Sequence, residues 1–345
     1  MGAAIVMNAL AHPLCKPSII SYLHHANPLA IIETRPGAQD YLINDFLQLV
    51  ARRHHVMGLP PGLLVDFYSY DGMYPRYPLL SHAWLSAPTV RCLGGNVIEQ
   101  IIALLDNGHY VEALLDEYYV ANRVAYQKLH YLHQNLIYGY DRQRACFLTQ
   151  GFDAQWAFAT MEMPFAQVQN GFVEGSGLAL FSWNDNPDFG RTRPFSAAII
   201  RTSLEDFLAR RSSFLSYQPE GVHYGADCYR VALALLDGAR GAQIDIRPWC
   251  VFYEHKQKLL QLAQYLAAQA LAPGAELING LSWLSDDFMT LRNHILEVKL
   301  ADECVEVASL EQEIAQLVAQ EESLIAQLLQ LLQLPQLLPL LPVQS

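Results

Sequence analysis

The sequence predicts an α+β protein, with an α+β lobe over residues 1–215 and a helical lobe over residues 216–345. Short apolar runs typical of strands alternate with helical stripes through the first part, whereas the apolar spacing from about residue 216 onward is helical. Hydrophobic residues make up 52% of the chain and charged residues 16%, which provides enough apolar surface for a substantial core.

The first lobe is expected to begin with an irregular stretch over residues 1–36 that contains one strand, Leu29–Ile32. A helix should start at Asp40, which can cap it, and end before residues 58–62, which are rich in Gly and Pro. A second helix is predicted over Gly95–Asn107, because Gly108 is a typical helix stop. The remaining expectations are strands at Leu63–Tyr68, Tyr110–Leu115, Leu136–Tyr138, Ala145–Leu148, Leu178–Trp183 and Ser196–Arg201, a hairpin turn at Gly139–Gln143, and a helix at Leu204–Arg211.

The second lobe is predicted to contain four helices. In the last of them, leucine and isoleucine recur at alternating spacings of four and three, and Glu321 interrupts this heptad seam once. Two interpretations remain open: the seam packs on neighbouring helices of the same chain, or it joins two copies in a homodimer. The predicted helices are Tyr224–Leu236, Trp249–Leu271, Leu281–Lys299 and Ala301–Leu334.

Charge and cysteine usage limit the functional class. The chain has 22 basic and 34 acidic side chains, a net charge of −12, and no cluster of Lys and Arg, which argues against nucleic-acid binding. The six cysteines are scattered, without the spacing of a zinc site or a disulfide framework, and this favours a reducing cytoplasm.

We expect a soluble protein. The N-terminus lacks the basic stretch of a secretory signal. The apolar segment Leu324–Val343 is interrupted by four Gln and three Pro residues, which disfavours a membrane-spanning helix.

The segment from Asp116 to Asp141 carries the densest functional signal. In it, His133 begins an apolar strand that runs into Gly139-Tyr-Asp at a turn. Such a strand holds an imidazole rigidly, so that the ring can act as a base toward a nucleophile at a helix N-terminus, with a third polar side chain to orient it.

The order GHYVEALLDEYYVANRVAYQKLHYLHQNLIYGYD, followed by ACFLTQGFD, resembles the N-terminal domain family of the butirosin-biosynthesis acyltransferase. That family is related to the papain-like bacteriocin-processing peptidases and accompanies nonribosomal peptide and polyketide assembly lines. A weaker resemblance extends to residues 247–256. The resemblance implies a papain-like fold of the cysteine-peptidase type and an acyl or aminoacyl transferase. Its substrate would be presented on the phosphopantetheine of an acyl or peptidyl carrier protein, without another cofactor.

Carried over one residue at a time, the resemblance assigns the catalytic base to His133. The orienting residue should lie near the end of the strand that follows, where the chain offers Thr149, Gln150 and Asp153. The position of the family's nucleophilic cysteine is occupied by Asp40. A thiol mechanism would therefore require Cys15 or Cys92 to enter the cleft, and Asp40 could instead pair with His133 or bind an amine.

The same segment supplies candidate substrate-binding residues, several of them aromatic, which either line a groove or pack in a core. His130 and His133, three residues apart, could also bind a metal with Asp141 or Glu117, although no regular ligand spacing supports this. The substrate-binding candidates are Asp116, Glu117, Tyr118, Tyr119, Arg123, Tyr126, His130 and Tyr138.

Three functional hypotheses follow. The first is an amide- or ester-forming acyl transferase with His133 as general base. The second is a papain-like scaffold without a catalytic thiol that binds a carrier protein, a peptide or a partner enzyme, for which Arg191, Arg193, Arg210 and Arg211 could form the docking face. The third is a hydrolase of the thioesterase or peptidase type.

Overall fold

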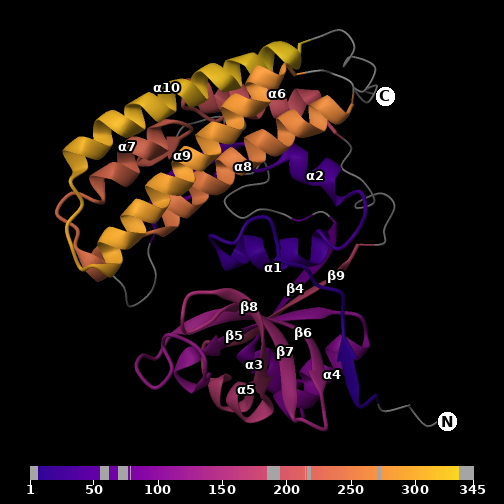
Figure 1. The fold of residues 1–345 in the computed structure, drawn as a ribbon. Coiled ribbons are helices and arrows are strands. Elements are labelled where there is room, and N and C mark those ends of the chain that lie inside the picture. Colours follow the sequence, from indigo (N-terminus) through magenta and orange to yellow (C-terminus); the bar gives the residue numbers. More distant parts are fainter. Residues whose placement is uncertain are drawn as a thin grey trace. The chain divides into compact units, whose positions relative to one another are not determined.

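The computed structural model describes residues 7–54, 62–68, 77, 79–184, 195–213, 215, 219–269 and 273–333. The chain forms two compact units, each built from two separated stretches (Figure 1). The sheet unit comprises Met1–Ala38 and Tyr77–Thr192, and the helical unit comprises Gln39–Arg76 and Arg193–Ser345. The α+β class is confirmed. The division differs from the expected boundary at residue 215, because strand pairing joins residues 48–54 and 62–68 to residues 222–224 across the sequence.

The sheet unit is organised around one antiparallel sheet in the strand order β4-β9-β5-β6-β7-β8, and β1 also pairs with β6. Three predicted strands are confirmed, and the one predicted at Leu136–Tyr138 is part of a longer strand. Gly139 lies inside this strand rather than in the turn. Its lack of a side chain is needed there, because a Cβ would collide with the carbonyl oxygen of Leu10 on β1. The strands are β1 (Ala9–Ala11), β4 (Leu80–Ser86), β5 (Tyr110–Asp116), β6 (Leu132–Asp141), β7 (Cys146–Phe152), β8 (Phe158–Pro164) and β9 (Gly177–Trp183).

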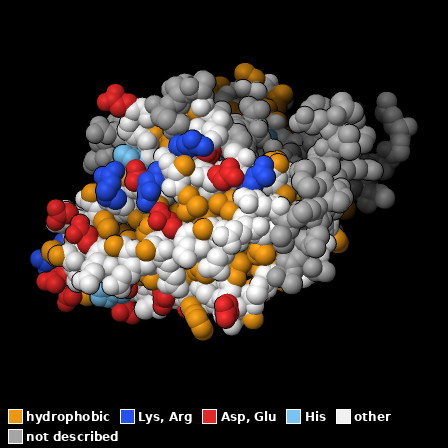
Figure 2. All heavy atoms as spheres, turned by 90° about the horizontal axis from the view of Figure 1, so that it is seen from above, with side chains coloured by type: hydrophobic (Ala, Val, Ile, Leu, Met, Phe, Trp, Pro, Cys, Tyr) orange, Lys and Arg blue, Asp and Glu red, His pale blue; other side chains and the backbone are white. Residues whose placement is uncertain are grey.

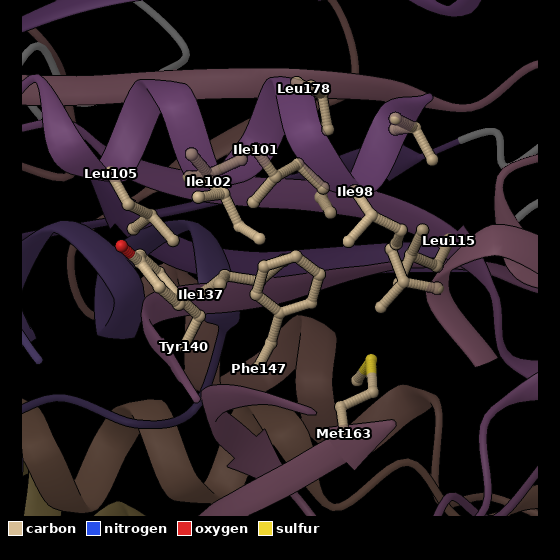
Figure 3. Packing of buried hydrophobic residues seen from close by; sticks show 14 of the residues in the cluster. Ile98, Ile101, Ile102, Leu105, Leu115, Ile137, Tyr140, Phe147, Met163 and Leu178 are labelled. Atoms are coloured by element: carbon tan, nitrogen blue, oxygen red, sulfur yellow. The ribbon is translucent and has the colours of Figure 1, made fainter. Parts of the chain in front are cut away.

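One face of this sheet, which we call the core face, packs against α3 (Ala87–Cys92), α4 (Val97–Asp106) and α5 (Phe165–Gly171). The predicted helix at 95–107 is therefore confirmed, with Asn96 accepting the N–H of Ile98 as its N-cap. Side chains of α4 point toward the strands (Figure 3). The buried cluster includes Ile98, Ile101, Ile102 and Leu105 of α4 and Val111, Ala113, Leu115, Ile137 and Phe147 of the strands.

The opposite face, which we call the α1 face, lies under α1 (Leu23–Ile32). The strand predicted at Leu29–Ile32 is wrong, since these residues form the end of this helix. Pro28 lies inside α1 and has no N–H, so the carbonyl of His24 lacks its usual helical donor. The hydroxyl of Tyr77 donates to that carbonyl at 3.1 Å instead, which explains how a helix tolerates proline there.

In the described part of the helical unit, a small sheet of β2 (Gln48–His54), β3 (Gly62–Tyr68) and β10 (Val222–Tyr224) accompanies six helices. The predicted strand at 63–68 is confirmed. The helix predicted from Asp40 is shorter than expected because Phe46 has a positive φ of 64° before β2 begins. The helices are α2 (Ala38–Asn44), α6 (Ala197–Ala209), α7 (Asp227–Ala234), α8 (Arg247–Ala268), α9 (Ala275–Leu300) and α10 (Val307–Leu331), with 3₁₀ turns at Glu117–Tyr119 in the sheet unit and Gly241–Gln243 here.

Two further predictions for this unit have clear outcomes. The strand predicted at Ser196–Arg201 is wrong, because Ser196 caps α6 through the N–H of Ile199. The four predicted C-terminal helices are confirmed in outline as α7 to α10. The heptad seam of α10 is buried against α9, α6 and α7, so the seam packs within the chain, as the first interpretation predicts.

The seam's one charged residue, Glu321, belongs to a fully buried polar cluster. Its carboxylate pairs with the ammonium of Lys256 and accepts a hydrogen bond from the Tyr229 hydroxyl at 2.7 Å. His255 Nδ1 lies 3.1 Å from the same carboxylate. Lys256 and Glu321 have no exposed surface, so this cluster ties α7, α8 and α10 together inside the bundle. In the described residues, no helix combines the length and the apolar character needed to cross a membrane.

Candidate functional site

The candidate site is built by the segment that connects β5 to β6. Asp116 ends β5, and its carboxylate accepts the N–H groups of Tyr118 at 3.1 Å and Tyr131 at 3.0 Å. The N–H of Glu117 donates to the carbonyl of Tyr131 at 2.9 Å. These bonds close the segment at its base, so Glu117 is held next to the first residues of β6.

His133 forms a carboxylate–imidazole pair with Glu117. Its Nδ1 lies 3.1 Å from Glu117 Oε1, and the two side chains are 30% and 8% exposed. Because a carboxylate only accepts hydrogen bonds, Nδ1 is the donor in this contact, and in the neutral imidazole the lone pair is then on Nε2. Nε2 has no hydrogen-bond partner among the described residues. The imidazole is therefore oriented from one side and has a basic nitrogen on the other.

Arg123 holds this pair in place. Its Nε lies 3.5 Å from Glu117 Oε1, and its Nε and Nη2 donate to Asn135 Oδ1 at 3.1 and 2.7 Å. Asn135 in turn donates to the carbonyl of His133 at 3.0 Å. Arg123 also crosses Gly151, where a side chain would crowd the guanidinium. Arg123 was predicted to bind substrate. It is only 5% exposed, and its guanidinium donates hydrogen bonds to Asn135 within the fold, so it acts as a positioning residue.

A second, more exposed pair lies beside the first in the sequence. His130 Nδ1 lies 2.7 Å from Asp116 Oδ2, and the His130 side chain is 65% exposed. Its ring stacks on Tyr118 with centroids 4.2 Å apart. Burial by itself raises the pKa of Asp116, but hydrogen bonds from His130 and two backbone amides outweigh it and lower that pKa.

The other predicted tyrosines are partly buried. Tyr119 contacts the rings of Tyr118 and His130. Tyr126 accepts a hydrogen bond from Gln127 at 3.2 Å. Tyr138 lies on β6, where burial and the nearby Glu162 raise its pKa. The structure thus gathers Tyr118, Tyr119 and His130 at one place and separates Tyr138 from them along the strand.

Cys15 and Gln150 are brought together, but on the α1 face. Gln150 Nε2 donates to the Cys15 carbonyl at 3.2 Å. The register places Gln150 opposite Leu136 and Thr149 opposite Ile137, whereas His133 lies opposite Leu115 of the core face. Since side chains alternate between faces, Gln150 cannot orient His133, and the expectation for Gln150 is wrong. The side chain that orients His133 is Glu117 instead.

Among the described residues, no cysteine forms a hydrogen bond with the His133 ring. Burial, together with the charge of Glu33, raises the pKa of Cys15 to about 11, which keeps the thiol protonated. Burial also raises the pKa of Cys146, Cys228 and Cys250. Cys92 ends α3 and is exposed. Nucleophilic catalysis usually depends on a lowered thiol pKa, and these four buried or partly buried thiols show the opposite.

Asp40 belongs to the helical unit rather than to the sheet unit that contains His133. It lies within α2 and accepts a hydrogen bond from the hydroxyl of Tyr265 at 2.9 Å. Burial and this carboxylate raise the pKa of Tyr265 to about 12. The local contacts of Asp40 are therefore those of a structural residue in its own unit.

The metal and docking expectations also have structural outcomes. In the part of the chain that the structure describes, His130, His133, Asp116 and Glu117 do not bring three ligand atoms together. Arg210 pairs with Asp227 and Glu322, and Arg211 pairs with Asp206. Figure 2 shows basic and acidic side chains interspersed on the displayed face. Arg191 and Arg193 lie outside the described residues.

Glu117 was expected to bind substrate or a metal rather than to orient His133, and Asn135 was not among the predicted site residues. The available signal was the alternation along β6, which puts Asn135 on the same face as His133. Comparison with known proteins adds no further assignment: no family model matches the chain, and no curated protein matches it.

Proposed function

We propose that the sheet unit is an acyltransferase domain in which His133 acts as general base and no enzyme thiol takes part. The observation that carries this proposal is the His133–Glu117 pair, because it orients one imidazole nitrogen and leaves the other with a free lone pair. The substrate class follows from the resemblance of residues 108–153, namely an acyl or aminoacyl group carried as a thioester.

In the proposed reaction, an acceptor amine or alcohol attacks the thioester carbonyl directly. His133 Nε2 takes the proton of the acceptor as the new C–N or C–O bond forms. The C–S bond then breaks, and the imidazolium returns the proton to the departing thiolate, which leaves as a thiol. Glu117 stabilises the imidazolium between these steps, and Arg123 holds Glu117 in position.

The proposal includes a papain-like ancestry for the sheet unit. An antiparallel sheet covered by a helix on the α1 face is compatible with it, and the resembling segment contains the whole 116–133 site. The partner that this function requires is an acyl or peptidyl carrier protein. All six cysteines are free, which fits work in a reducing cytoplasm.

A second candidate function is a non-catalytic scaffold that binds a carrier protein, a peptide or a partner enzyme. It is favoured by the same Arg123–Glu117–Asn135 contacts, since a buried network of this kind also stabilises a loop without any chemistry. The third candidate, a hydrolase, differs from the first only in using water as the acceptor.

Replacing His133 with glutamine should lower thioester turnover by about 10²–10⁴-fold, because glutamine keeps the polar contact but cannot accept the proton. The measurement uses the full chain with acyl N-acetylcysteamine thioesters as soluble substitutes for phosphopantetheine. Amide, ester and free-acid products are quantified by mass spectrometry, with and without an added amine.

The control is His82→Gln, which removes an exposed imidazole on β4, outside the candidate site, and should change turnover little. Equal thermal stability of the two variants would show that the loss is chemical. Turnover unaffected by His133→Gln would remove the base assignment and favour the scaffold, and free acid as the sole product would favour the hydrolase.

A further inference from the structure

The edge strand β4 presents main-chain groups that have no partner in the described part of the chain. β4 is the last strand at one end of the sheet, where it pairs with β9. Just beyond β4 the Ala87 N–H donates to the Ser176 carbonyl at 2.9 Å, and ladder bonds alternate along a strand, so the odd-numbered residues bond to β9. His82 and Trp84 therefore direct their N–H and C=O groups outward, where the described residues provide no partner for them.

This edge also lacks the features that usually protect an exposed strand. The sequence of β4, Leu-Ser-His-Ala-Trp-Leu-Ser, contains no Lys, Arg, Asp, Glu or Pro. Burial lowers the pKa of His82, so the strand carries no charge at pH 7. The edge strand β8, by contrast, carries Glu162 and ends at Pro164, which has no N–H. Of these two edges, β4 is the one suited to pairing with another strand.

The side chains of β4 leave room for a second strand and offer it an apolar surface. The indole of Trp84 occupies the space that a side chain at Gly177 of β9 would fill, which fixes the ring on the sheet. Trp84 is nevertheless 50% exposed. A ring that is already held in place loses little conformational freedom when a partner covers it. Ala83, between the two outward residues, is small and exposed, so another backbone can approach closely.

We propose that β4 pairs with β4 of a second copy of the chain, antiparallel and about a two-fold axis at Ala83. This register places His82 opposite Trp84 of the second copy, and Trp84 opposite His82 of the second copy. Each such pair exchanges both of its N–H and C=O groups, because both residues direct these groups outward. The edge is therefore complementary to itself, as a two-fold interface requires. The proposal goes beyond acyl transfer and does not depend on it.

Charge favours a second copy as the occupant. The chain has a net charge of −12, so two copies repel each other over most of their surface. A two-fold pairing centred on Ala83 brings together residues of β4, and none of these is charged. The same lack of charge gives β4 no means of selecting a charged peptide from another protein. This interface also differs from the heptad seam of α10, which is buried within the chain.

The test measures the mass of the full chain by sedimentation equilibrium over a roughly 100-fold concentration range. The wild-type mass should rise toward twice the mass of one chain. Ala83→Lys places two ammonium groups opposite each other at the axis and should weaken association at least about tenfold. The matched control is Thr160→Lys, at an exposed position of β8, which adds the same charge to the other edge and should keep the dimer.

An exchange of charge tests the register itself. Ala83→Glu alone should also be monomeric, whereas an equimolar mixture of the two Ala83 variants should recover the dimer, because opposite charges then meet at the axis. Thermal unfolding checks that each variant is folded. His82→Gln should associate like the wild type, because the interface uses the main chain at this position.

Three outcomes would each overturn the proposal. The first is a wild-type chain that stays monomeric over the whole range, which would leave this edge to an extended peptide of another protein. The second is an Ala83→Lys variant that associates as strongly as Thr160→Lys. The third is a mixture of folded Ala83→Lys and Ala83→Glu chains that does not associate.

Discussion

Replacing Glu321 with glutamine should destabilise the protein by about 3–5 kcal/mol, because it leaves the Lys256 ammonium buried without a counter-charge. Neither side chain has any exposed surface, so water cannot replace the lost carboxylate. The free energy of unfolding, measured by urea denaturation, checks this. A loss below about 1 kcal/mol would be typical of a surface pair and would contradict the buried cluster.

The double variant Glu321→Leu/Lys256→Met distinguishes the cost of one unpaired buried charge from the net contribution of the ion pair to stability. Removing both charges leaves no unpaired ion, so this variant should be close to wild type in stability or above it. Tyr229 would lose its acceptor, which limits the gain. A double variant as unstable as the single one would show that the cluster stabilises the fold beyond charge pairing.

Because of the Glu321 carboxylate, we also expect the stability of the protein to depend on pH in the acid range. Burial alone raises the pKa of Glu321, but the charge of Lys256 and the bond from His255 outweigh it and lower that pKa to about 2. Because the folded-state pKa is below the ordinary value, the stabilisation is complete above pH about 4.3 and is lost as the pH falls toward 2. Glu321→Gln should lack this part of the acid transition.

The second large effect is expected at Arg123. Replacing it with leucine should cost about 3–5 kcal/mol, since Glu117 would remain buried without its cation and Asn135 would lose two donors. The control Arg144→Leu removes an exposed partner of Glu162 and should cost less than about 1 kcal/mol. Urea denaturation measures both.

Arg123→Leu should also lower hydrogen-exchange protection at the N–H groups of Tyr118 and Tyr131, which close the 116–131 segment. Arg123→Lys keeps the charge but loses the planar fork and should lie between wild type and the leucine variant. If Arg123→Leu were as stable as Arg144→Leu, the positioning role of Arg123 would be excluded.

Local patterns predicted most of the regular elements because one face of each element is apolar, as in α4 and β5. They failed at Leu29–Ile32 and at Ser196–Arg201, where a short apolar run fits a helix or a strand equally well. At Leu29–Ile32 the helix is supported by the hydroxyl of Tyr77, which donates to the His24 carbonyl. At Ser196–Arg201 the helix is supported by the N-cap that Ser196 forms.

The candidate site was located from the sequence, but its internal arrangement was not. His133 stood out because Gly139-Tyr-Asp ends its strand, whereas the orienting role of Glu117 depends on how a 15-residue excursion from 117 to 131 closes. Gln150 was misassigned because a neighbouring strand was considered without its register. The role of Glu321 required three helices that are distant in sequence.

The most direct test of the central claim, catalysis by an oriented imidazole without a thiol, is the thioester turnover of the double variant Cys15→Ala/Cys92→Ala. Turnover should stay within a few-fold of wild type, because Cys15 keeps its proton and its Sγ donates to the Ala30 carbonyl at 3.4 Å. Loss of turnover as deep as that of His133→Gln, with the fold intact, would contradict the account and establish a thiol nucleophile.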